Sequence, residues 1–145
     1  MLGLKDKLSI VLVDKKGNIK ATQKTSNIIT NGGFDYLCQR IGQSRDQSMI
    51  YAGVGTNDTD PDTADTTLGD EVARISGIYS HIDGTKVFSN ESTFGPGVGT
   101  GFLKEAGLFD TISAGTMLNR TTFPEIRKEA DDILILRWEV ELSEV

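Results

Sequence analysis

The segment 133–142 alternates between apolar and mostly polar side chains, and this alternation constrains the fold more than any other feature of the sequence. Successive side chains of a β-strand point to opposite faces of its sheet, so a period of two predicts a strand with one buried and one solvated face. The face expected to be buried carries Leu134, Leu136, Trp138, Val140 and Leu142. The face expected to meet water carries Ile133, Ile135, Arg137, Glu139 and Glu141. We therefore expect Trp138, Leu136 and Val140 to lie in a hydrophobic core.

Short apolar segments rich in β-branched residues recur along the rest of the chain. They predict strands over 8–13, 49–55, 75–82, 86–94, 102–109 and 116–123. Between them stand Gly, Asn and Asp, the residues that tight turns favour, as at 14–18, 83–84 and 113–115. Many short strands with such turns are typical of a β-sandwich or barrel. We predict a mainly β protein, an antiparallel β-sandwich with one short helix and an N-terminal β-hairpin.

The sequence predicts a single domain over residues 1–145, because no segment is long enough to be a linker between two. Its first part, 1–29, contains the predicted N-terminal hairpin. Two arrangements of this hairpin remain open: it belongs to the sheet, or it forms an arm that reaches away from the main body, 30–145.

One short helix is predicted to follow Thr30 and Asn31, whose side-chain oxygens can accept hydrogen bonds from free backbone N–H groups, and to end at Gly42. Phe34, Leu37, Cys38 and Ile41 recur at helical spacing and predict a buried apolar stripe, with the Cys38 thiol inside. A single helical turn is predicted over 68–72.

Charge and composition argue against several classes of partner. The net charge is −6, and the lysines near the N-terminus alternate with apolar and acidic residues, so we expect no nucleic-acid surface. No apolar run approaches the roughly 18 residues of a membrane span, and the first residues do not resemble a signal peptide. We expect a protein made in a cytoplasm that does not enter a membrane.

The residues that could carry chemistry form no convincing site, so we predict no enzyme, no catalytic residue and no cofactor. His81 is the only histidine and is expected to face solvent, and Cys38 is the only cysteine. The segment 95–101 is rich in glycine but lacks the Lys-Ser/Thr pair of a phosphate loop. The segment from Asp58 to Asp62 has alternating carboxylates without the Gly and Glu of a calcium loop. It is interpreted as a solvated turn, and weak cation binding remains an alternative.

Three segments in order resemble bacteriophage tail-collar and tail-fibre attachment domains. They are YAGVGT at 51–56 with DTTLGDEVAR at 65–74, GFLKEAGLFD at 101–110, and GTMLNRTTFP at 115–124 with the closing strand. NIITNGG at 27–33 extends the resemblance, which covers most of the chain from residue 27. The long shaft of fibre proteins does not follow in this sequence, so the resemblance implies attachment to a particle and leaves receptor binding unsupported.

The resemblance implies a non-catalytic virion protein, assembled in the host cytoplasm, whose partners are other virion structural proteins and further copies of itself. The first placement is the tail, neck or baseplate, as a fibre- or collar-type module in contact with tail or baseplate proteins. The alternative is a decoration protein that cements the major capsid protein of the head, for which an N-terminal arm would be suited. A glycan- or receptor-binding module is a third hypothesis, with Tyr51, Tyr79 and Phe88 as its only aromatic candidates; their strand positions make core roles the expectation.

The segment 102–109 carries large apolar groups on both faces of a predicted strand. Such a strand is expected to be covered on both sides. The second cover is either another part of the same chain or a neighbouring subunit. In the latter case the contact residues would include Phe102, Lys104, Leu108 and Phe109.

Overall fold

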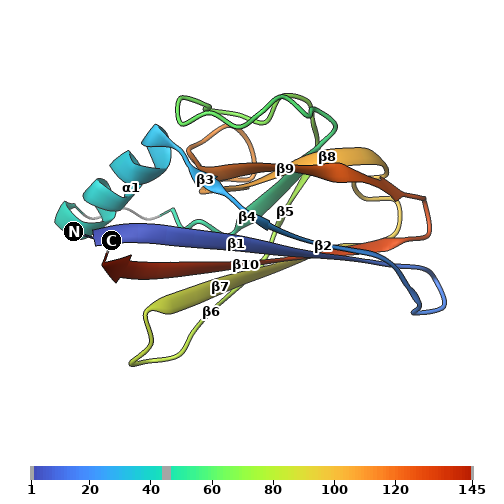
Figure 1. Cartoon of the computed structure of the whole chain (residues 1–145), viewed down its shortest axis with the longest axis horizontal. Coiled ribbons are helices and arrows are strands. Elements are labelled where there is room, and N and C mark those ends of the chain that lie inside the picture. Colours follow the sequence, from blue (N-terminus) through green and yellow to red (C-terminus); the bar gives the residue numbers. More distant parts are fainter. Residues whose placement is uncertain (1, 44–46, 145) are drawn as a thin grey trace.

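Two antiparallel sheets of five strands each lie face to face, with one short helix at one end (Figure 1). The structure is a computed structural model and describes residues 2–43 and 47–144. The first sheet contains, in spatial order, β2 (Ile19–Ser26), β1 (Leu2–Val13), β10 (Ile133–Glu144), β7 (Val87–Phe94) and β6 (Ile78–His81). The second contains β3 (Ile28–Ile29), β9 (Met117–Lys128), β8 (Gly101–Phe109), β4 (Tyr51–Gly55) and β5 (Glu71–Ser76). The predicted β-sandwich with an N-terminal hairpin is confirmed.

The core lies between the two sheets, and β10 supplies its centre. Trp138, Leu136 and Val140 are at most 1% exposed, so all three are core residues as predicted. Leu142, at the far end of the same face, is 37% exposed because the sandwich opens there. The period of two in the sequence therefore identifies the buried face along most of the strand.

The N-terminal hairpin is part of this core, so of the two arrangements that the sequence left open the structure has the one within the sheet. β1 lies between β2 and β10 and pairs with β10 from Leu2 to Val13. Its inward side chains Leu8, Ile10 and Leu12 are at most 2% exposed. Removing this strand would take these three side chains out of the core and leave one edge of β10 unpaired.

The predicted strand 75–82 divides into two strands that belong to different sheets. Residues up to Ser76 continue β5, which pairs with β4, and Ile78 starts β6, which pairs with β7. The chain crosses between the sheets at Gly77, whose N–H donates to the carbonyl oxygen of Ile50 at 2.6 Å. The helical turn predicted over 68–72 is also wrong, because residues 71–72 already form the start of β5.

The helix α1 (Asn31–Gly42) begins and ends where predicted. The side of the helix that is buried differs from the predicted one. The Thr30 hydroxyl accepts a hydrogen bond from the Gly33 N–H, as an N-cap does. Gly33 then lies so close to β9 that a Cβ atom there would stand 2.5 Å from the Leu118 carbonyl oxygen. This close approach turns Gly33 and Tyr36 inward. Three members of the predicted stripe consequently face outward: Phe34, Cys38 and Ile41.

We expect Trp138→Ala to destabilise the protein by about 3–5 kcal/mol, because the truncation leaves a large cavity between the sheets. Chemical denaturation followed by circular dichroism measures this. Glu139→Ala is the matched control. The Glu139 side chain is next to Trp138 in the chain but points to solvent, so this variant is expected to stay within about 0.5 kcal/mol of wild type. Equal losses in the two variants would contradict this assignment of faces.

Candidate functional site

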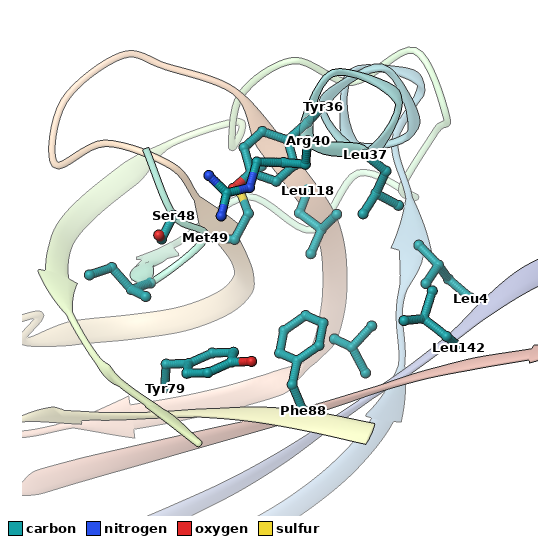
Figure 2. A pocket seen from close by; sticks show the side chains of 12 residues that line it. Leu4, Tyr36, Leu37, Arg40, Ser48, Met49, Tyr79, Phe88, Leu118 and Leu142 are labelled. Carbon is teal, nitrogen blue, oxygen red and sulfur yellow. The ribbon is translucent and has the colours of Figure 1, made fainter. Parts of the chain in front are cut away.

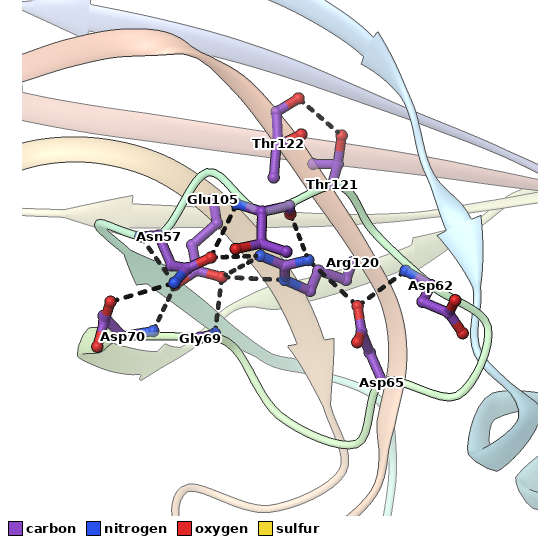
Figure 3. A network of polar contacts seen from close by, with 10 residues as sticks. Asn57, Asp62, Asp65, Gly69, Asp70, Glu105, Arg120, Thr121 and Thr122 are labelled. Atoms are coloured by element: carbon purple, nitrogen blue, oxygen red, sulfur yellow. Dashed lines mark hydrogen bonds and ion pairs between the residues drawn. The ribbon is translucent and has the colours of Figure 1, made fainter.

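The loop 56–70 covers the outer face of the second sheet and is held there by a buried polar network (Figure 3). Below the loop, Leu68 packs against Phe109 and Met117 in a small apolar cluster that is separate from the main core. The loop therefore supplies the second cover of β8. The expectation that this strand is covered on both faces is confirmed, and the cover is the chain itself.

Glu105 is the centre of the network and is fully buried. Its Oε1 atom accepts hydrogen bonds from the backbone N–H groups of Asp70 at 2.8 Å and Asn57 at 3.3 Å. Its Oε2 atom accepts from the Gly69 N–H at 2.9 Å and from Nε of Arg120 at 3.0 Å. One carboxylate thus binds both ends of the loop to the sheet.

Arg120, which is 3% exposed, joins the same loop from the neighbouring strand β9. Its Nη1 atom donates to the Thr59 carbonyl oxygen at 2.9 Å and to Oδ2 of Asp65 at 3.1 Å. Its Nη2 atom lies 3.0 Å from Oε2 of Glu105 and 3.3 Å from Oδ1 of Asn57. The guanidinium group therefore places each of its nitrogens on a polar atom of the loop or of Glu105.

A glycine in β4 makes room for this carboxylate. A Cβ atom on Gly55 would stand 2.4 Å from Oε1 of Glu105 and equally close to the Asp70 carbonyl oxygen. Any larger residue would displace either the carboxylate or the loop backbone. The YAGVGT segment thus supplies space, while the charged residues come from the other two segments.

Two of the four residues expected to contact a neighbouring subunit are inside the chain. Leu108 belongs to the main core and Phe109 lies under the loop, both at most 1% exposed, so their assignment to a subunit contact is wrong. The ring of Phe109 also carries the guanidinium of Arg74, 3.5 Å above its centroid. Leu108 reaches the core face because a β-bulge between Leu103 and Glu105 shifts the alternation on which the expectation depended, whereas Phe109 stays on the outer face and is buried by the loop.

The other two residues of that set remain at the surface. Phe102 is 50% exposed, with the Arg127 guanidinium 5.3 Å from its ring centroid. Lys104 is half-buried and forms ion pairs with Asp58 at 3.7 Å and Glu125 at 4.0 Å. A contact of this pair with another subunit stays a prediction.

The carboxylates of the acidic loop mostly serve the loop itself. Oδ1 of Asp62 accepts from the Ala64 N–H at 2.8 Å, and Oδ2 of Asp65 accepts from the Asp62 N–H at 2.9 Å. Among residues 2–43 and 47–144, no group of three His, Cys, Asp or Glu side chains is placed to hold a metal ion. Cation binding by the segment from Asp58 to Asp62 stays untested.

His81 faces solvent at the end of β6, as predicted. Its Nδ1 atom lies 2.8 Å from the Val87 carbonyl oxygen. No helix in the described part of the chain is long and apolar enough to cross a membrane.

A pocket of about 480 Å³ opens at the helix end of the sandwich, where α1 leaves a gap between the sheets (Figure 2). Figure 2 shows Tyr36 and Leu37 of the helix above the pocket and Tyr79 and Phe88 of the first sheet below it. The remaining lining residues are Leu4, Arg40, Ser48, Met49, Ile50, Leu118, Val140 and Leu142. The volume and apolar lining are typical of a site that takes a small apolar group or a protruding side chain.

Two of the aromatic residues expected in the core belong to this pocket instead. Tyr79 is 57% exposed on the edge strand β6, and its ring centroid lies 5.8 Å from that of Phe88. The third, Tyr51, is half-buried beside Phe109. The sequence gives no periodic signal for this pocket, since its lining comes from seven separate segments that only the fold brings together.

A buried carboxyl group joins the two sheets near the pocket. Asp6 of β1 accepts a hydrogen bond from the side-chain amide of Asn119 on β9, and Oδ1 of Asn119 accepts from the Leu108 N–H at 2.9 Å. Burial raises the pKa of Asp6 from 3.8 to about 6, against the hydrogen bond from Asn119, which lowers it. The charged form of the Asp6 carboxyl group is therefore less favourable in the folded protein than in water.

No model of a known protein family matches the chain, and neither does any curated protein or solved structure.

We expect Glu105→Gln to destabilise the protein by about 3–5 kcal/mol, because the buried Arg120 guanidinium would lose its counter-charge. Glu125→Gln removes a carboxylate from the exposed ion pair with Lys104 and should change stability by less than about 1 kcal/mol. Urea unfolding of both variants tests the difference. Limited proteolysis should also cut Glu105→Gln within residues 56–70 faster than wild type.

Asp6→Asn should change how stability depends on pH. Because the folded-state pKa of Asp6 lies above its unfolded value, this carboxyl group contributes stability below pH 3.8 that is lost as the pH rises through about 6. The variant lacks this loss, so its stability relative to wild type should rise by about 3 kcal/mol between about pH 4 and pH 7.5. Urea unfolding at several pH values measures the difference, and a constant difference would contradict the burial argument.

Proposed function

We propose that the chain is a non-catalytic structural protein of a bacteriophage virion, a small exterior module of the tail, neck or baseplate that acts through repeated subunit contacts. It would assemble in the host cytoplasm and bind other virion structural proteins. The proposal combines the three segments that resemble tail-collar and tail-fibre domains with the position that the fold gives to those segments.

The observation that carries the proposal is that all three segments meet in the network around Glu105. Gly69 and Asp70 come from the first segment, Glu105 from the second and Arg120 from the third. The charged side chains of these motifs hold a loop on a sheet and are already bonded to one another. Motifs that serve the architecture of a domain suit a particle component better than an enzyme.

The pocket at the helix end supplies a place for a neighbouring virion protein. Its lining is mainly apolar, and two exposed side chains lie at this end of the sandwich: Tyr79 of the lining, which is 57% exposed, and Ile41 of α1, which is 82% exposed. Exposed apolar side chains on this scale typically mark a site of protein contact. A protruding apolar side chain or strand from an adjacent subunit would cover them.

Placement on the head is the weaker alternative because it depended on an N-terminal arm. Residues 2–13 pair along their length with β10 and residues 19–26 pair with β1, so this hairpin is not free to lie across neighbouring capsid subunits. The tail, neck or baseplate placement does not need such an arm.

We expect the protein to copurify with density-gradient-purified particles from a lysate of cells that carry this gene, at a few dozen copies or fewer per particle. Quantitative mass spectrometry measures the copy number, and immunogold electron microscopy locates the protein on the tail or neck. Hundreds of copies on the head would support capsid decoration, and absence from intact particles would overturn the virion role.

A pocket variant gives this experiment a matched control. Leu37→Asp places a charge in the pocket lining and should abolish incorporation when supplied in trans to particles that lack the wild-type protein. Val98→Asp adds the same charge at an exposed apolar residue of the loop 95–101, which does not line the pocket, and should incorporate normally. Circular dichroism first establishes that both variants fold.

A further inference from the structure

The outer face of the first sheet complements itself row by row, and we propose that it is the interface of a symmetric dimer of this chain. Here the outer face means the solvent-side residues of β2, β1, β10 and β7, which lie side by side in that order (Figure 1). The inference deepens the proposed function, because it names one of the subunit contacts on which that function rests.

The register of the four strands arranges this face in rows that cross the sheet. From β2 to β7 the rows read Ser26–Lys7–Glu139–Ser89, Lys24–Ser9–Arg137–Glu91, Thr22–Val11–Ile135–Thr93 and, over three strands, Ile19–Val13–Ile133. Two rows carry a lysine on β1 or β2 and a glutamate on β10 or β7: Lys7 with Glu139, and Lys24 with Glu91. Both glutamates also form ion pairs of 3.4 Å with Arg137 of the same chain, which lies between them on β10. Ser89, at the end of the first row, is buried.

Consider a two-fold axis that runs parallel to the strands, above the line between β1 and β10. Each row would then face the same row of a second copy, with the order of its residues reversed. Lys7 would then face Glu139 of the second copy, and Lys24 would face Glu91. In the next row Val11 would face Ile135. Opposite charges and apolar groups thus meet their counterparts at the same time, which is what an isologous contact requires.

Two rows of this face carry apolar side chains, which a face in contact with water alone would not favour. Val11, Val13, Ile133 and Ile135 are all partly exposed, and Ile19 beside them is 66% exposed. They form a patch of β-branched side chains on adjacent strands next to the turn 14–18. Burying such a patch against its copy would remove apolar surface from water.

The size of the face suits a weak contact between copies. Four strands spaced about 4.8 Å apart, over the seven residues from Lys7 to Val13 that rise about 3.4 Å each, cover about 460 Å² per copy. The total of about 900 Å² is that of a weak, concentration-dependent interface. Two sheets packed in this way keep their strand directions within about 30° of each other, so the central rows stay superposed.

Charge-reversed variants of the purified full chain test this arrangement by sedimentation equilibrium. Wild type is expected to form dimers as its concentration rises to about 0.3 mM, where even a weak specific contact is populated. Lys7→Glu/Lys24→Glu alone and Glu91→Lys/Glu139→Lys alone should each dimerise at least about tenfold more weakly, because like charges would then face each other. An equimolar mixture of the two variants should form heterodimers, since the reversed rows are complementary again.

The mixture separates contacts between copies from effects within one chain, because each variant has the same charges within its own chain whether alone or mixed. In addition, Lys24 and Glu91 are separated within the sheet by two strands, β1 and β10. Lys15→Glu/Lys16→Glu, which makes the same change of charge in the turn, should dimerise like wild type. Thermal melting establishes that all variants fold. A monomeric wild type, a stoichiometry other than two, unchanged dimerisation of the reversed variants, or a mixture that stays monomeric would each overturn the dimer.

The outcome is independent of the virion experiment. A monomer in solution would remove this interface and leave the copy number on particles to decide the proposed function. Absence from particles would remove the proposed function and leave a measured dimer in place.

Discussion

The buried ion pair between Glu105 and Arg120 is the interaction on which the second sheet depends. A carboxylate without solvent is tolerated only when a counter-charge and hydrogen-bond donors surround it, and here the donors are the guanidinium and three backbone N–H groups of the loop 56–70. The charge therefore requires the loop, and the loop in turn covers Phe109 and Met117. The second sheet and the conformation of the loop 56–70 therefore depend on each other.

This arrangement leaves the molecule with surfaces of different character. The outer face of the second sheet is closed by the chain itself, while the outer face of the first sheet is open and combines charged rows with an apolar patch. The helix end is open as well, since α1 covers only part of the gap between the sheets and a pocket remains. Surfaces that the chain does not cover itself are the ones on which contacts with other subunits are proposed.

The sequence pattern predicted core residues and element ends correctly where the local pattern and the tertiary environment agree. The period of two in 133–142 identified Trp138 as a core residue, and the cap at Thr30 located the start of the helix. It was wrong where a single close approach overrides the pattern. Gly33 against β9 turned the helix so that Phe34 and Ile41 face outward, and the bulge near Glu105 turned Leu108 to the core face of β8. The one visible signal of the network was a glutamate in a strand expected to be covered on both faces.

By itself the sequence determined the kind and order of most elements, because turn residues and side-chain alternation act between neighbours along the chain. It also determined that the three resembling segments occur in one order. Only the tertiary structure decided which faces are covered: that the hairpin of residues 2–26 completes a sheet, that Leu108 and Phe109 lie inside, and that residues from seven segments line one pocket. These outcomes depend on contacts between residues far apart in sequence, which no local period records.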